Sequence, residues 1–163
     1  MNSNTTADIQ GLAEEKELSS VPSRYLTYFN DRDYIKNGKG EEGILSIAKV
    51  LIKLSISSQR EVYLSKEKLL FLDGEKSLTL SYTSEEGSFI TKSYFWPFST
   101  VITLDKEVIP DTINIYPLHI YPYLYNENTV YIHTHYAAAV TFNSNINNLN
   151  ETLGHLNPDE ESL

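Results

Sequence analysis

The residues of this chain with the greatest potential for chemistry are three histidines in its C-terminal half. His133 and His135 lie one residue apart in the segment Thr129 to Val140, and His119 precedes them. Imidazoles can bind a metal ion, move protons near neutral pH, or pack against neighbouring aromatic rings. Which of these roles applies depends on the elements that position the three rings.

The residues around these histidines predict an antiparallel hairpin. Residues 113–125 and 129–136 alternate between apolar and polar side chains, and three polar residues, 126–128, separate them. Successive side chains of a strand point to opposite faces, so one face of this hairpin carries aliphatic side chains for a core. The other face pairs His119 with His135, Tyr121 with His133, Tyr123 with Tyr131, and Tyr125 with Thr129.

Two prolines predict the position of this hairpin in its sheet. Pro117 and Pro122 both lie in the first strand of the hairpin. Proline has no amide hydrogen and cannot donate to a neighbouring strand. We therefore expect the first strand of the hairpin to lie at a sheet edge.

A metal site at His119, His133 and His135 is one hypothesis for the polar face. Zinc or iron binding requires imidazole nitrogens from two segments to converge on one point at about 2.1 Å. A His-X-His strand with a third histidine opposite resembles the metal-binding barrels of the cupin type. Those barrels continue with a glutamate a few residues later, whereas Tyr-Ala-Ala-Ala-Val follows here and the next acid is Glu151. The resemblance is therefore confined to the histidines.

A binding surface is the second hypothesis for this face, and plain cross-strand packing is the third. Tyrosine supplies a large, rigid contact area with a polar tip and is enriched at protein interfaces. The candidate binding residues are Tyr121, Tyr123, Tyr131, His133 and His135. In the packing interpretation, the same rings cover one another on a half-exposed sheet.

Charge is distributed unevenly along the chain, whose formal net charge is −9. The last basic residue is Lys106, and residues 113–163 contain acids but no Lys or Arg. A surface that binds phosphates needs clustered Lys or Arg, so we expect no nucleic-acid binding through the C-terminal half. The modest basic excess of residues 23–60 suits an acidic partner or an ordinary solvated surface. Asp31 and Asp33, which flank Arg32, are expected to be part of that surface.

Length and composition predict a single mainly β domain. The chain has 163 residues, of which 40% are hydrophobic and 12% aromatic, and it has no cysteine for disulfides or thiolate chemistry. Short apolar segments from Glu61 onward predict an antiparallel β-sandwich or barrel. We expect its turns at Asp73-Gly74, at residues 85–87 and at Pro97. Residues 44–57 fit a helix face at first and a strand toward their end.

The two ends of the chain are predicted to be accessory segments. Residues 1–22 are polar and acidic and are expected to form an extended arm, with at most a short helix over residues 9–18. Residues 23–157 are assigned to the β-rich domain and residues 158–163 to an acidic tail. Helical spacing predicts a C-terminal helix over residues 146–156 and a short helix or turn at residues 25–29.

Known catalytic motifs are missing from the sequence. It has no G-x-S-x-G elbow, no phosphate-binding glycine loop and no H-E-x-x-H pair. No apolar run approaches the roughly 18 residues of a membrane span, and the first residues lack a secretory signal pattern. These features favour a protein that acts in the cytoplasm or within a virion.

The function that these observations favour is that of a non-catalytic interaction or structural protein without a cofactor. It is expected to self-associate or to join a larger assembly, such as a phage or virus particle, by analogy with that class of components. One alternative is a metal-dependent β-barrel enzyme with zinc or iron at the three histidines. Another is a small-ligand-binding β-barrel module.

Overall fold

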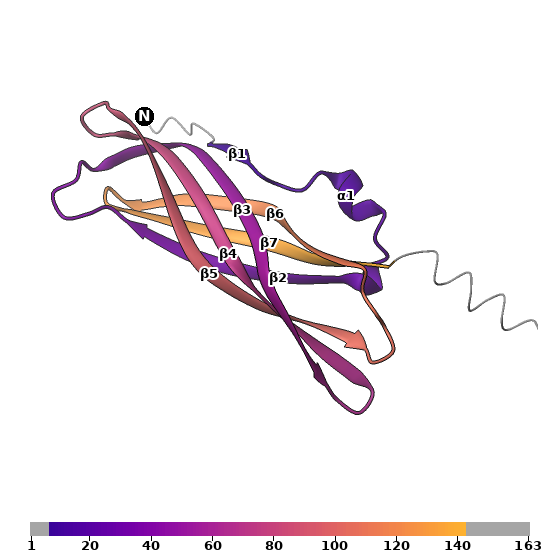
Figure 1. The fold of residues 1–163 in the computed structure, drawn as a ribbon. Coiled ribbons are helices and arrows are strands. Elements are labelled where there is room, and N and C mark those ends of the chain that lie inside the picture. Colours follow the sequence, from indigo (N-terminus) through magenta and orange to yellow (C-terminus); the bar gives the residue numbers. More distant parts are fainter. Residues whose placement is uncertain (1–6, 143–163) are drawn as a thin grey trace, which may run out of the picture.

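Two packed β-sheets make up the fold in the computed structural model of this chain, which describes residues 7–142 (Figure 1). One sheet has the strand order β1-β3-β4-β5 and the other has the order β2-β7-β6. The elements are β1 (Asp8–Gln10), α1 (Glu15–Ser19), the 3₁₀ turn η1 (Ser23–Tyr25), β2 (Leu26–Lys36), β3 (Ile44–Tyr63), β4 (Glu67–Ser84), β5 (Phe89–Asp105), β6 (Thr112–Asn126) and β7 (Thr129–Thr141). The predicted mainly β, sandwich-like architecture is confirmed. The helix expected over residues 146–156 lies outside the described residues.

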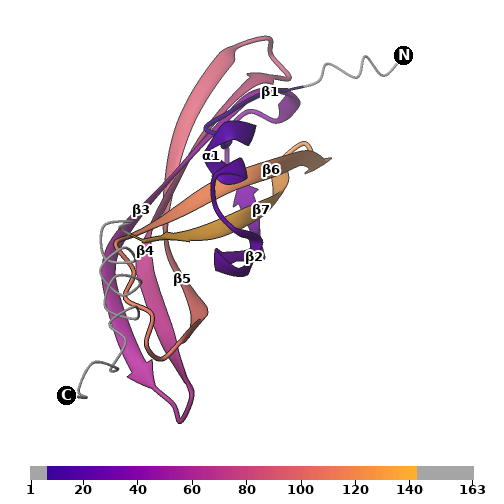
Figure 2. The same cartoon turned by 90° about the vertical axis from the view of Figure 1, so that its right-hand side faces the viewer.

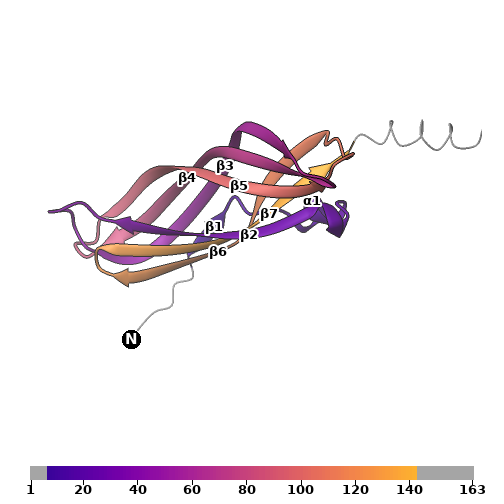
Figure 3. The ribbon, with the colours of Figure 1, turned by 90° about the horizontal axis from the view of Figure 1, so that it is seen from below.

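The three longest strands form a continuous meander. β3, β4 and β5 pair in sequence order and antiparallel, and their far end extends beyond the three-stranded sheet (Figures 1 and 2). Seen from below, the two sheets lie one over the other (Figure 3). Buried and more exposed side chains alternate along much of β4, as expected for a strand with one face toward a core.

The expected turn at Asp73-Gly74 is wrong, because β4 runs through both residues without a break. Gly74 pairs with Ile56 on β3 and with Phe98 on β5. A Cβ atom at Gly74 would lie 2.1 Å from the carbonyl oxygen of Ser55 and 2.5 Å from the Phe98 ring. Glycine is therefore required here by the close approach of its neighbours, and not by a turn.

The break expected at Pro97 is also wrong, whereas the turn at residues 85–87 is confirmed. β5 continues through Pro97 as the edge strand of its sheet among the described residues, and an edge tolerates a residue without an amide hydrogen. Gly87 has a φ of 86°, and its amide donates to the carbonyl of Ser84 at 3.0 Å. This conformation is accessible to glycine and closes the β4–β5 hairpin.

The short helix or turn expected at residues 25–29 is limited to η1, which ends at Tyr25, and is wrong for the residues that follow. β2 begins at Leu26 and pairs along its whole length with β7. Its later side chains alternate, with Asp33 and Ile35 buried and Arg32 and Tyr34 exposed. The ambiguous segment 44–57 is likewise strand throughout, as part of β3. Pairing with a neighbouring strand thus overrides the local helical spacing.

Residues 8–13 contact both sheets near the start of the described chain. β1 pairs in parallel with β3, with Ile9 opposite Val50. The amide of Ala13 then donates to the carbonyl of Pro117 on β6 at 2.8 Å. The helix expected over residues 9–18 is therefore limited to α1, and this part of the predicted arm contacts both sheets.

A polar layer separates two apolar clusters in the core. Along the inner face of β4, Leu70 and Leu72 belong to one cluster, and Leu78 and Leu80 belong to the other. Lys76 lies between them and is buried. The partners of Lys76 come from the opposite sheet and form the second of the two sites described below.

Candidate functional site

The predicted register of the β6–β7 hairpin is confirmed at the histidines. His119 lies opposite His135, Tyr121 opposite His133, and Tyr123 opposite Tyr131. β6 is an edge strand among the described residues, as its two prolines indicate. The turn is shorter than predicted, because Asn126 and not Tyr125 lies opposite Thr129, after a shift in register.

The aromatic side chains of this hairpin lie close together on the outer face of the three-stranded sheet. The ring centroids of His133 and His135 are 4.6 Å apart, and those of Tyr121 and His135 are 5.8 Å apart. His119 and His135 are separated by 6.4 Å. The structure therefore brings all the predicted binding residues to one surface.

β2 extends this surface with residues that the sequence did not indicate. Asn30 lies opposite His135, Arg32 opposite His133, and Tyr34 opposite Tyr131, with the two tyrosine rings 5.1 Å apart. The available signal was the period-two alternation of residues 28–36, which the helical spacing at residues 25–29 obscured. We call the combined surface the Tyr/His face, and it consists of Tyr28, Asn30, Arg32, Tyr34 and Lys36 of β2, His119, Tyr121, Tyr123 and Tyr125 of β6, and Tyr131, His133 and His135 of β7.

Exposed tyrosines and a lack of acids characterise the Tyr/His face. Five tyrosines are between 56% and 66% exposed, namely Tyr28, Tyr34, Tyr121, Tyr123 and Tyr125. The only acids in β2, β6 and β7 are Asp31 and Asp33, and both bind Lys76 on the inner side. This face therefore has a positive bias on a chain whose net charge is −9.

The geometry gives no support to the metal hypothesis. Within residues 7–142, no group of three or more His, Cys, Asp or Glu side chains is arranged to hold a metal ion. His119, His133 and His135 share a face, but no carboxylate joins them there. What the three rings offer in this arrangement is aromatic contact and imidazole hydrogen bonding.

A second candidate site is the buried ion-pair network inside the sandwich. Lys76, only 1% exposed, donates to Asp31 Oδ2 at 2.5 Å and to Asp33 Oδ2 at 2.6 Å. Its ammonium also lies 5.5 Å from the centre of the Trp96 ring, within the range of a cation–π contact. The expectation that Asp31 and Asp33 are ordinary solvated surface is wrong, because β2 turns both carboxylates toward the inner side.

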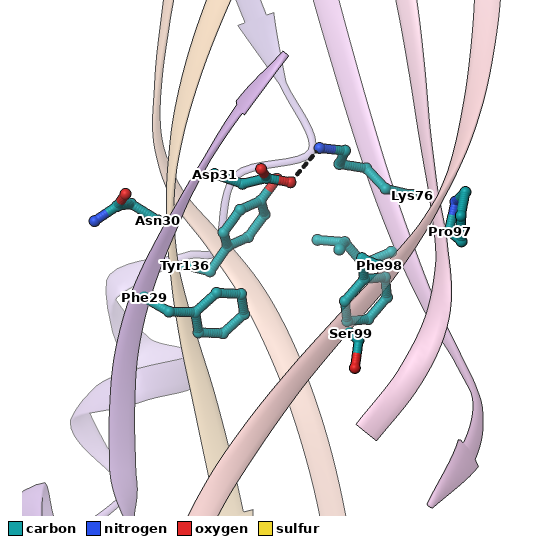
Figure 4. A pocket seen from close by; sticks show the side chains of 9 residues that line it. Phe29, Asn30, Asp31, Lys76, Pro97, Phe98, Ser99 and Tyr136 are labelled. Atoms are coloured by element: carbon teal, nitrogen blue, oxygen red, sulfur yellow. Dashed lines mark hydrogen bonds and ion pairs between the residues drawn. The ribbon is translucent and has the colours of Figure 1, made fainter. Parts of the chain in front are cut away.

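A pocket of about 250 Å³ opens beside this network, on the side of the sandwich where β2 and β5 are the edge strands (Figure 4). Aromatic and aliphatic side chains line it together with the charged pair. The Tyr136 side chain extends from β7 toward Asp31 and Lys76 (Figure 4). The lining residues are Phe29, Asn30, Asp31, Leu54, Lys76, Pro97, Phe98, Ser99 and Tyr136.

Burial raises the pKa of two acidic groups around this network. Desolvation raises the pKa of the Asp33 carboxyl above its ordinary value of 3.8, although the Lys76 ammonium opposes the shift. Desolvation also raises the pKa of the Tyr136 phenol, which therefore stays protonated at neutral pH. The phenol is thus available as a hydrogen-bond donor and acceptor.

The raised pKa of Asp33 leads to a prediction about stability and pH. The folded protein holds this proton more tightly than the unfolded chain does, so Asp33 lowers stability as pH rises from 3.8 through its folded pKa. Asparagine does not ionise, so the stability of Asp33→Asn relative to wild type should increase from about pH 4 to about pH 7. Urea denaturation at both pH values measures this difference. A relative stability that falls over the same range would show that Lys76 outweighs the burial.

The fold and the two sites define a β-sandwich-like protein with an aromatic outer face and an inner charged pocket. Comparison with known proteins found no matching family model, no similar curated protein and no similar solved structure. Among residues 7–142, no helix has the length and apolar character needed to cross a membrane. The functional conclusion therefore depends on the two sites themselves.

Proposed function

We propose that this chain is a non-catalytic interaction protein that joins an assembly through the Tyr/His face. The observation that carries the proposal is the group of five exposed tyrosines on one acid-free sheet face. Contiguous exposed aromatic surface marks interaction sites, and tyrosine is among the residues that contribute most to binding. Strand pairing fixes the backbone on which these rings stand, so little ordering entropy opposes their association.

The charge of the face favours an acidic surface as its partner, and we propose a second copy of this chain. Arg32 and Lys36 give the face a positive bias, whereas the chain as a whole is acidic. Exposed acids stand on the outer side of the four-stranded sheet, at Asp73, Glu75 and Asp105. A contact between two different faces repeats from copy to copy and builds rings or filaments. A subunit of a larger particle, such as that of a phage or virus, fits this geometry.

Sedimentation velocity tests this proposal directly. We expect wild type to self-associate and the double variant Tyr34→Ala/Tyr121→Ala to associate at least about tenfold more weakly, because it removes two central rings. Ile109→Ala is the control, because Ile109 is 80% exposed but lies in the connection between β5 and β6, outside both proposed contact surfaces. Its association should equal that of wild type. A monomeric wild type, or a double variant that associates normally, would contradict the proposal.

The salt dependence of association distinguishes an acidic partner surface from a face that packs on its own copy. Salt screens exposed charges, so association of Arg32 and Lys36 with carboxylates should weaken as the salt concentration rises from about 0.05 M to about 0.5 M. Strengthening over this range would indicate that two Tyr/His faces oppose each other, because salt then screens the repulsion between their cations. A chelator at about pH 7.5 should change nothing, whereas loss of association on chelation would favour the metal alternative.

A single-stranded oligonucleotide serves as the control ligand. Aromatic rings on a sheet also stack on nucleic-acid bases when clustered cations accompany them. The Tyr/His face has only two fixed cations, Arg32 and Lys36. We therefore expect no binding in fluorescence anisotropy at physiological salt. Tight binding would indicate that the partner of this face is a nucleic acid and not a protein.

A further inference from the structure

The charges at the pocket inside the sandwich are not balanced. Two carboxylates, Asp31 and Asp33, share the single ammonium of Lys76. Asp33 is buried, whereas the Asp31 side chain is 42% exposed and lines the pocket. Asp31 is therefore the carboxylate that a ligand entering the pocket can reach.

A buried hydroxyl in the same pocket is unpaired. Tyr136 is 1% exposed, and its hydroxyl makes no hydrogen bond of normal geometry among residues 7–142, although the neighbouring Thr134 hydroxyl is close enough to oppose the rise in its pKa that burial causes. Its ring stands on the pocket wall with the hydroxyl directed at the Asp31–Lys76 pair (Figure 4). Buried polar groups in folded proteins are nearly always satisfied, so this one indicates a missing partner. A hydrogen-bond donor placed in the pocket could bond to the Tyr136 hydroxyl and add to the Asp31 carboxylate, which already accepts from Lys76 and from the Arg32 amide.

The remaining walls are apolar and set the size and character of the ligand. Phe29, Leu54 and Phe98 line the pocket from three different strands. Its volume of about 250 Å³ equals roughly eight times the 30 Å³ that a water molecule occupies in the liquid. A molecule of about eight to ten non-hydrogen atoms with an apolar body therefore fits. This combination of apolar walls and a few directed polar groups is typical of small-molecule sites.

We propose that this pocket binds a small organic cation, an ammonium group on an apolar or aromatic body. The ammonium donates hydrogen bonds to the Asp31 carboxylate and to the Tyr136 hydroxyl. The body contacts Phe29 and Phe98. A free amine and a lysine side chain from another protein share this chemistry. Asp31 and Tyr136 lie on the inner side of the sheet, and Asn30 alone is common to the pocket lining and the Tyr/His face, so occupation of the pocket and assembly can be tested separately.

Calorimetric titration of the full chain with three related probes tests the proposal. The probes are 2-phenylethylamine, 2-phenylethanol and phenylacetate, which share a ring and differ in charge. We expect the amine to bind with a Kd below about 1 mM. The alcohol and the acid should bind at least about tenfold more weakly, because neither carries an ammonium. No binding of the amine at about 10 mM, or equal binding of the alcohol, would overturn the proposal.

Two variants test the residues assigned to the ammonium. Asp31→Asn leaves Asp33 to pair with Lys76 and should weaken amine binding at least about tenfold. Tyr136→Phe removes only the hydroxyl and should weaken it about threefold to tenfold while leaving the fold intact. Asp105→Asn, at an exposed carboxylate at the end of β5, is the matched control and should bind as wild type does. Amine binding that is unchanged in Asp31→Asn would overturn the assignment.

A further pair of titrations identifies the source of the ammonium. Nα-acetyl-lysine amide presents a lysine side chain without its backbone charges. If it binds more tightly than 2-phenylethylamine, the natural ligand is a side chain of a protein partner. If it binds more weakly, the ligand is a free amine. Either result supports an ammonium-binding site in the pocket. If neither probe binds, the proposed site is excluded, and the proposed assembly function is unaffected.

Discussion

Lys76→Met should lower the free energy of unfolding by about 3–5 kcal/mol, the cost of removing one partner from a buried ion pair. The change leaves the Asp33 carboxylate in the polar layer of the core without its ammonium. Asp31 adds little to this loss, because its side chain is 42% exposed and water screens its charge. Urea denaturation at neutral pH measures the effect.

Two further variants isolate the cause of that loss. Lys53→Met makes the same substitution at an exposed position of β3 and should change stability by no more than about 0.5 kcal/mol. Adding Asp33→Asn to Lys76→Met removes the uncompensated charge and should restore part of the stability. A Lys76→Met variant as stable as the Lys53→Met control would show that the network is not buried.

Gly74→Ala should lower the free energy of unfolding by about 2–3 kcal/mol, near the upper end of the usual cost of overpacking. The added methyl group would lie 2.1 Å from the Ser55 carbonyl oxygen, so the backbones of β3 and β4 must separate. It would also displace the Phe98 ring from the pocket wall. Thermal or urea unfolding measures the loss.

The neighbouring residue provides the control for Gly74. Glu75 lies on the exposed side of β4, and Glu75→Ala should stay within about 0.5 kcal/mol of wild type. Replacing Phe98 by Leu in the Gly74→Ala background relieves only the ring contact and should recover only part of the loss. Full recovery would mean that the backbone contact with Ser55 is unimportant.

The β6–β7 hairpin could be predicted from sequence because its signals are local. Alternation along both strands and a polar connection between them determine which residues face each other, and His119 and His135 are opposed as predicted. The predicted turn is one residue too long, but the register shift next to Leu124 leaves the pairing of the preceding residues as predicted. Short-range patterns are sufficient where the partner strand is adjacent in the chain.

Other elements could not be predicted because their partners are distant in sequence. Asp73-Gly74 carries a typical hairpin signal, and only the contacts with Ser55 and Phe98 show why glycine is needed there. The acids beside Arg32 resemble a solvated turn until β2 pairs with β7 and turns them toward Lys76. The inner pocket depends on five strands and has no signature in any single segment.

The pairing of β2 with β7 has a consequence for when the Tyr/His face comes into existence during synthesis. β3, β4 and β5 join neighbours through short turns and can form as the chain emerges. β2 is made before them, yet its partner β7 is the last strand of the described chain. The surface proposed for assembly is therefore absent from any nascent chain that has not yet reached Thr141. Ribosome-bound or truncated fragments lack the contact surface, so only chains completed through β7 can join the assembly.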